Sequence, residues 1–256
     1  MKAIFMRCLL CFTLTMILFS ATLCPVKAIT VVEKRANPWN QAWIYPEDEI
    51  VTPNIVIIYL HGNGNNGSSN IKDLWVMANV NHPLKYAKED TLVITDDVLI
   101  ICPQSRGNGQ FRSRRQDLSN MIKEIRDEFP EALLILAGHS NGAIATFIVA
   151  TAENPCIDGY VFISGDRSGE SAKLPFTKNC FVAYGINDNV RNRSVFSNLF
   201  EIKISDNKYA QKCQVTDAIT KNAYMVGNWS HGQAPLVFLE DFFWEWVYKV
   251  ALEKGV

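Results

Sequence analysis

The sequence has 256 residues, of which 48% are hydrophobic and 20% are charged, a mixture that argues against an intrinsically disordered chain. The formal net charge of −1 gives no electrostatic reason to expect a nucleic-acid partner. The length allows one large domain or two small ones. No linker or change of composition divides residues 29–256, so we expect a single domain there.

The N-terminal segment has the features of a secretory signal peptide. Lys2 and Arg7 precede an uncharged stretch over residues 8–26, and Val26-Lys27-Ala28 has the small-x-small form of a cleavage site. We therefore predict a signal peptide over residues 1–28 and a secreted or periplasmic protein. An uncleaved membrane anchor is the alternative, because the apolar run approaches the length of a membrane span.

Four cysteines follow this segment, and their even number permits up to two disulfides. Their pairing does not follow from the sequence, and Cys102 could equally be a buried thiol at the end of an apolar run. No C-x-x-C or H-E-x-x-H pattern is present, so we expect no metal site. The four are Cys102, Cys156, Cys180 and Cys213.

Apolar runs and helical patterns alternate along the chain after two short predicted strands. This alternation is typical of a mostly parallel sheet that is covered by helices on both faces. Strands are predicted over residues 29–34, 42–45, 54–60, 98–102, 132–137, 159–164, 180–184 and 223–226. Helices are predicted over residues 71–80, 113–129, 141–151 and 235–252.

The segment Gly138-His-Ser-Asn-Gly142 fits the pattern G-x-S-x-G between a predicted strand and a predicted helix. A sharp strand-to-helix turn leaves room only for hydrogen at the two glycines, and it holds the central serine in a strained conformation with its hydroxyl outward. Ser140 is therefore the candidate nucleophile. The motif is short, and its strength here comes from the surrounding strand, turn and helix.

A serine nucleophile needs a base that is itself oriented by a carboxylate. Among the four histidines, His231 is preferred because it lies in a loop between the last predicted strand and the last predicted helix. His139 lies within the turn and is expected to point away from Ser140. His61 ends a strand, and His82 is expected to be solvated in a polar loop.

The orienting acid is expected between serine and histidine in the chain. Asp188 follows the predicted strand 180–184, and Gly185 before it and Val190 after it indicate a tight turn. Asp166 also follows a strand end and is the competing candidate. We prefer Asp188 on this loop geometry.

The segment Gly62-Asn-Gly-Asn-Asn-Gly67 permits two interpretations. It matches the dinucleotide-binding pattern G-x-G-x-x-G, but the acidic residue that this fold wants at the end of the next strand is not there. In the other interpretation the loop supplies an oxyanion site, in which the backbone N–H of Asn63 pairs with that of Asn141. We favour the oxyanion interpretation, because a nucleophile, acid and base occur elsewhere in a consistent order.

The order Ser140, Asp188, His231, together with the strand-turn-helix and the His61-Gly62 loop, resembles the α/β-hydrolase superfamily. The resemblance covers residues 29–256 and implies a single-domain α/β-hydrolase fold with an eight-stranded, mostly parallel sheet. Within the superfamily, the chain weakly resembles secreted esterases of the feruloyl-esterase and polyhydroxybutyrate-depolymerase type. The short segment over residues 166–179 implies an open site without a large lid.

The function that these features predict is a secreted serine hydrolase that cleaves carboxylic esters through an acyl-enzyme, without a cofactor. Its partner would be a small-molecule or lipid-like ester, and a membrane would be involved only if residues 1–28 remain uncleaved. Amide or thioester hydrolysis, acyl transfer, and a catalytically silent binding protein remain alternatives. The natural substrate and the oligomeric state do not follow from the sequence.

Overall fold

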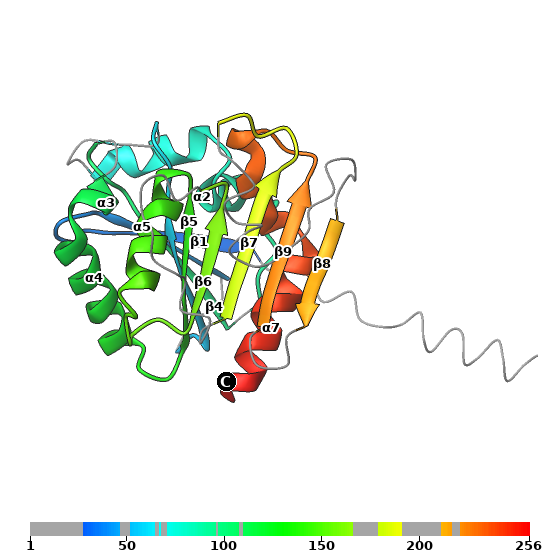
Figure 1. The fold of residues 1–256 in the computed structure, drawn as a ribbon. Coiled ribbons are helices and arrows are strands. Elements are labelled where there is room, and N and C mark those ends of the chain that lie inside the picture. The colour runs from blue at the N-terminus through cyan, green and yellow to red at the C-terminus, as the bar shows by residue number, and fades with distance from the viewer. Residues whose placement is uncertain are drawn as a thin grey trace, which may run out of the picture.

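The protein is described by a computed structural model over residues 28–46, 52–64, 67, 71–95, 97–107, 110–165, 179–190, 211–216 and 221–256. The strands of this part of the chain form one sheet (Figure 1). They are β1 (Ile29–Lys34), β2 (Gln41–Pro46), β3 (Ile55–Leu60), β4 (Val98–Pro103), β5 (Leu133–His139), β6 (Gly159–Ile163), β7 (Asn179–Gly185), β8 (Gln211–Thr216) and β9 (Lys221–Gly227).

The sheet is parallel in its centre and antiparallel at both edges. Its order is β1-β2-β4-β3-β5-β6-β7-β9-β8. All neighbouring pairs from β4 to β9 are parallel, whereas β1 pairs antiparallel with β2, β2 with β4, and β8 with β9. The carboxyl ends of β3, β5, β6, β7 and β9 therefore meet along one edge of the sheet, where loops can converge.

The helices cover both faces, as the apolar strands predict. Every residue of β3 and β4 is buried, because alternate side chains contribute to two separate hydrophobic clusters. The helices are η1 (Ile71–Asn79), α2 (Pro83–Lys88), α3 (Gln110–Ser113), α4 (Arg115–Glu128), α5 (Asn141–Thr151), η2 (His231–Leu239) and α7 (Asp241–Lys254). One cluster includes residues of α2, η2 and α7, and the other includes residues of α4 and α5.

Four elements differ from the sequence prediction. The described part of the sheet has nine strands and not eight, because the polar segment β8 pairs antiparallel with β9 at the edge. The short helices α2, which begins at Pro83, and α3 were not predicted. The predicted helix over residues 235–252 is divided into η2 and α7, because Glu240 is extended at φ −102° and ψ 125°.

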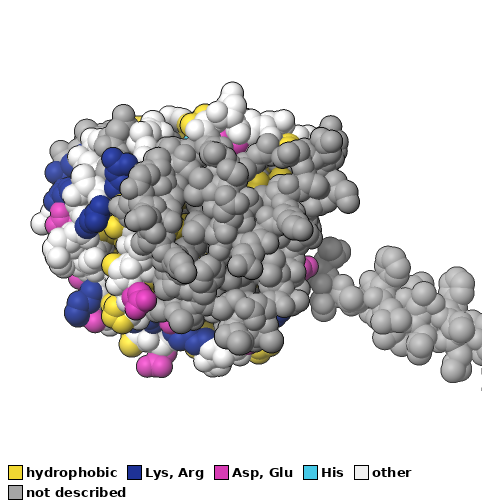
Figure 2. All heavy atoms as spheres, in the orientation of Figure 1, with side chains coloured by type: hydrophobic (Ala, Val, Ile, Leu, Met, Phe, Trp, Pro, Cys, Tyr) yellow, Lys and Arg dark blue, Asp and Glu magenta, His cyan; other side chains and the backbone are white. Residues whose placement is uncertain are grey.

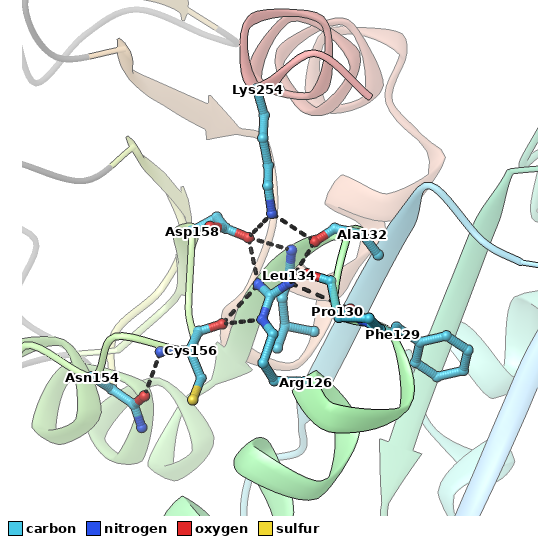
Figure 3. A network of polar contacts seen from close by, with 9 residues as sticks. All are labelled: Arg126, Phe129, Pro130, Ala132, Leu134, Asn154, Cys156, Asp158 and Lys254. Carbon is cyan, nitrogen blue, oxygen red and sulfur yellow. Dashed lines mark hydrogen bonds and ion pairs between the residues drawn. The ribbon is translucent and has the colours of Figure 1, made fainter.

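A polar cluster ties the opposite end of the sheet together (Figure 3). Arg126 of α4 donates to the carboxylate of Asp158 and to the carbonyls of Ala132 and Cys156. Lys254, near the end of α7, donates to the same carboxylate and to the carbonyl of Ala132. These contacts join α4 and α7, which cover opposite faces of the sheet, to the start of β5. They lie at the end of the sheet opposite the carboxyl ends of the parallel strands.

Burial by itself would raise the pKa of Asp158. Hydrogen bonds from the Leu134 amide and from the side chains of Lys254 and Arg126, together with the positive charge of Arg126, outweigh burial and hold this pKa below its usual value. The cluster therefore keeps its carboxylate ionised at neutral pH.

The expectation for the cysteines can be compared with the described residues, whereas residues 1–27 of the predicted signal peptide lie outside them. No disulfide joins Cys102, Cys156 and Cys180 to one another, and burial raises the pKa of the Cys102 thiol. No helix in the described ranges has both the length and the apolar character that a membrane span requires. Lysine and arginine side chains gather over α3 and α4 (Figure 2), where Arg114 pairs with Asp117 at 2.6 Å.

Candidate active site

The turn between β5 and α5 holds Ser140 in an unusual backbone conformation. Its φ of 53° and ψ of −115° lie outside the regions that L-residues favour. A Cβ atom on Gly138 would lie 2.4 Å from the carbonyl of Gly142, and one on Gly142 would lie 2.0 Å from the carbonyl oxygen of Leu60. Only glycine fits at both positions, because β5, α5 and the end of β3 meet here. This is the crowding that the sequence pattern predicts.

A chain of hydrogen bonds links three side chains at the carboxyl edge of the sheet. Nε2 of His231 lies 2.9 Å from Oγ of Ser140, and Nδ1 of His231 lies 2.8 Å from Oδ2 of Asp188. The side chain of His231 is 18% exposed, whereas that of Asp188 is only 1% exposed. The structure thus brings together the three residues that the sequence selected as nucleophile, base and acid, and the acid is buried more deeply than the base.

Asp188 lies in the tight turn that its neighbours predict. Its own amide donates to the carbonyl of Gly185 at 3.1 Å, and its Oδ1 accepts from the amide of Val190 at 2.9 Å. Burial would raise the pKa of Asp188, but His231, Ser164 and the Val190 amide outweigh it and keep this pKa below its usual value. The carboxylate is therefore ionised and faces Nδ1 of His231.

The loops that carry the acid and the base are bonded to each other. The amide of Ile186 donates to the carbonyl of Gly227 at 2.9 Å, and the amide of Asn187 donates to the carbonyl of Trp229 at 3.0 Å. The side-chain amide of Asn187 also donates to Oδ1 of Asn228 at 2.8 Å. These bonds extend the pairing of β7 with β9 beyond the strand ends, so the two loops are held as one unit.

The loop after β3 lies directly against the nucleophile. A Cβ atom on Gly62 would lie 3.0 Å from Cβ of Ser140. At the start of α5, Gly142 packs closely against the carbonyls of Leu60 and His61. Asn63 is the residue after Gly62, and Asn141 is the first residue of α5. Each residue predicted to supply an oxyanion amide is therefore next in the chain to a residue of this contact, Asn63 to Gly62 and Asn141 to Ser140.

His61 has a structural role beneath this loop. Its Nδ1 donates to the carbonyl of Gly62 at 2.7 Å, and its Nε2 accepts from the amide of Ser105 at 3.0 Å. Burial lowers the pKa of His61 to about 4. The ring is therefore neutral near pH 7, and it fastens the loop after β3 to the segment that follows β4.

The prediction that His82 is solvated is wrong. The residue is fully buried, and its ring lies edge-on to Tyr59 with the centroids 4.8 Å apart. Its Nδ1 accepts from the amide of Leu84 at 3.0 Å, so His82 caps the helix that Pro83 begins. The sequence signal was the proline, which is favoured in the first turn of a helix.

His139 makes a contact that sequence reasoning missed. Its Nε2 donates to the backbone carbonyl of His231 at 2.9 Å, and the two rings lie 5.0 Å apart. Burial, followed by the nearby His231, lowers the pKa of His139 to about 3. No sequence signal identifies this contact, because 92 residues separate the two histidines.

The competing acid Asp166 lies outside the described residues, as does all but the last residue of the segment expected to lack a lid, residues 166–179. Within the described ranges, no group of three or more histidine, cysteine or acidic side chains is placed to hold a metal ion.

No protein-family model matches this sequence, and no curated protein matches it either. Solved structures are similar in fold. A structure described as a thermostable esterase has 14% identity and a TM-score of 0.56, with 88% of this chain covered. The chain spans only 63% of that esterase.

Two proteins from Staphylococcus aureus are similar over almost their whole length. A fluorophosphonate-binding serine hydrolase has 14% identity and a TM-score of 0.50, with 86% of this chain and 98% of that chain covered. An S-formylglutathione hydrolase has 12% identity and a TM-score of 0.51, with 91% and 98% covered. At these identities the similarity establishes the fold. The chain has the α/β-hydrolase fold that the sequence resemblance implies.

Proposed function

We propose that this protein is a serine hydrolase that cleaves carboxylic esters through an acyl-enzyme. The observation that carries the proposal is the unbroken hydrogen-bond chain from Ser140 through His231 to the buried Asp188. A neutral serine is a weak nucleophile, and this chain is the arrangement that makes one reactive.

Each residue would have a distinct role in the reaction. Nε2 of His231 takes the proton of Ser140 as Oγ attacks the ester carbonyl, and it then gives that proton to the leaving alcohol. Asp188 accepts from Nδ1 and stabilises the imidazolium that forms. The amides of Asn63 and Asn141 would donate to the developing oxyanion, and water would then release the acid from Ser140.

The narrower choice of an ester substrate is supported by the names of similar proteins, which include an esterase as well as serine hydrolases. Hydrolysis of an amide or thioester, or acyl transfer to an alcohol, would use the same three side chains. The substrate that we propose is a small or lipid-like ester, and no cofactor is required.

A fluorophosphonate probe tests the proposal directly, because it phosphonylates only an activated serine. We expect labelling of the unaltered protein and none of Ser140→Ala. Turnover of short p-nitrophenyl esters should fall by a factor on the order of 10⁶ in this variant if the three residues act as a unit. Full ester hydrolysis by Ser140→Ala would refute the assignment, and a protein that neither labels nor turns over would be a silent member of the fold.

A panel of acyl substrates separates the remaining alternatives. Ester, amide and thioester analogues with the same acyl group should be hydrolysed at rates that rank the ester first. An added alcohol that diverts the acyl group into a new ester at the expense of free acid would instead identify an acyltransferase.

We also propose that residues 1–28 direct export and are removed. The basic start, the uncharged stretch and the Val26-Lys27-Ala28 sequence support this proposal. N-terminal sequencing of the exported protein should begin at Ile29. A protein that retains residues 1–28 in the membrane fraction would favour the anchored alternative.

A further inference from the structure

The loop that carries His231 is fastened by two side chains from elsewhere in the chain. Nε2 of His139 donates to the carbonyl of His231 at 2.9 Å. Nδ2 of Asn81, from the segment before α2, donates to the carbonyl of Gly232 at 2.9 Å. The two acceptors are consecutive carbonyls at the start of η2, so the two donors fix neighbouring peptide groups.

The sequence explains why the second of these carbonyls needs an outside donor. Pro235 lies inside η2 and has no backbone N–H. In the 3-10 geometry of η2, the carbonyl of Gly232 would accept from residue 235. Pro235 therefore removes this helical donor, and the side chain of Asn81 supplies the missing bond.

We propose that His139, assisted by Asn81, is a positioning residue that holds the base His231 against Ser140. This inference rests on the function proposed above. His139 precedes the nucleophile in the chain and bonds the backbone of the base, so one side chain couples the turn at Ser140 to the loop of His231 without touching the reacting atoms.

The charge state of His139 suits this role. Burial and the nearby His231 lower the pKa of His139 to about 3, so the ring of His139 is neutral near pH 7. A neutral ring can donate from Nε2 to the carbonyl, and it adds no second positive charge beside the imidazolium that forms during acylation. The groups that act on it are His231, Asp188 and His61.

A matched pair of substitutions at His139 tests the proposal. Glutamine keeps an N–H donor at a reach similar to that of Nε2, whereas methionine has nearly the same length and no donor. We expect His139→Met to lower kcat about tenfold with little change in KM, since one neutral hydrogen bond is lost. His139→Gln should recover most of that loss. Asn81→Leu should lower kcat by a smaller factor in the same direction.

A second measurement does not depend on turnover. The proton between Nδ1 of His231 and Asp188 should give a downfield NMR resonance, and its exchange with water reports how firmly the base is held. We expect faster exchange in His139→Met and nearly native exchange in His139→Gln. Thermal unfolding of both variants shows whether a change in overall stability accounts for the difference.

The outcomes separate the two proposals. Equal proton exchange in the two variants, or equal kcat in His139→Met and the unaltered protein, would overturn the positioning role. Absence of fluorophosphonate labelling in the unaltered protein would overturn the proposed function, and the exchange measurement would still decide whether His139 orders His231.

Discussion

The tightest contact at the nucleophile turn gives a quantitative prediction. An alanine at position 142 would place its Cβ 2.0 Å from the carbonyl oxygen of Leu60 and 2.8 Å from that of His61. Cβ atoms do not approach other heavy atoms closer than 3.0 Å, so Gly142→Ala must move the start of α5 away from β3 by about an ångström. The clash is with the backbone of a central strand, so no side-chain rotation can relieve it.

Overpacking of this kind costs about 3 kcal/mol at the upper end of its usual range. For a domain of this size, about 2–4 °C of Tm is lost per kcal/mol, so we expect a Tm lower by about 6–12 °C. The same shift separates Asn141 from Gly62, and fluorophosphonate labelling of Ser140 should slow markedly.

Urea unfolding and thermal scans measure the first effect, and the labelling rate measures the second. Gly232→Ala is the control for stability, because its Cβ would meet no atom within 4 Å. We expect this control to change the free energy of unfolding by less than about 0.5 kcal/mol. If Gly142→Ala unfolded at the same urea concentration as the unaltered protein, the steric argument would be refuted.

Three further substitutions test the electrostatics. Asp188→Asn should lower kcat by about 10⁴ with KM little changed, since the imidazolium of His231 loses its carboxylate; near-native kcat in a pH-rate measurement would contradict this. The pKa of Asp158 is lowered from its usual value, so this carboxylate contributes stability that is present above that usual value and is lost as the pH falls through the lowered pKa. Acid unfolding of Asp158→Asn should therefore be less steep, and an unchanged slope would count against the cluster. Arg126→Met removes the hydrogen bonds of Arg126 to four backbone carbonyls and to the Asp158 carboxylate, which keeps Lys254 and the Leu134 amide, and should cost about 1–3 kcal/mol in urea unfolding.

Some features of the protein follow from local sequence alone. The apolar runs at β3, β4 and β5 have no polar face, so they are stable only when both faces are covered, and this predicts the parallel centre of the sheet. The two glycines around Ser140 likewise indicate a turn too crowded for a side chain, which the contacts at Gly138 and Gly142 confirm.

Other features depended on partners that are distant in the chain. Strand β8 is polar and forms because β9 offers a free edge, and the helix break at Glu240 reflects how η2 and α7 pack on the sheet. The meeting of Ser140 with His231, 91 residues apart, is decided by the parallel order of β5, β7 and β9. The hydrogen bond from His139 to the His231 carbonyl also depends on the tertiary structure, because it joins residues 92 apart and neither local sequence indicates it.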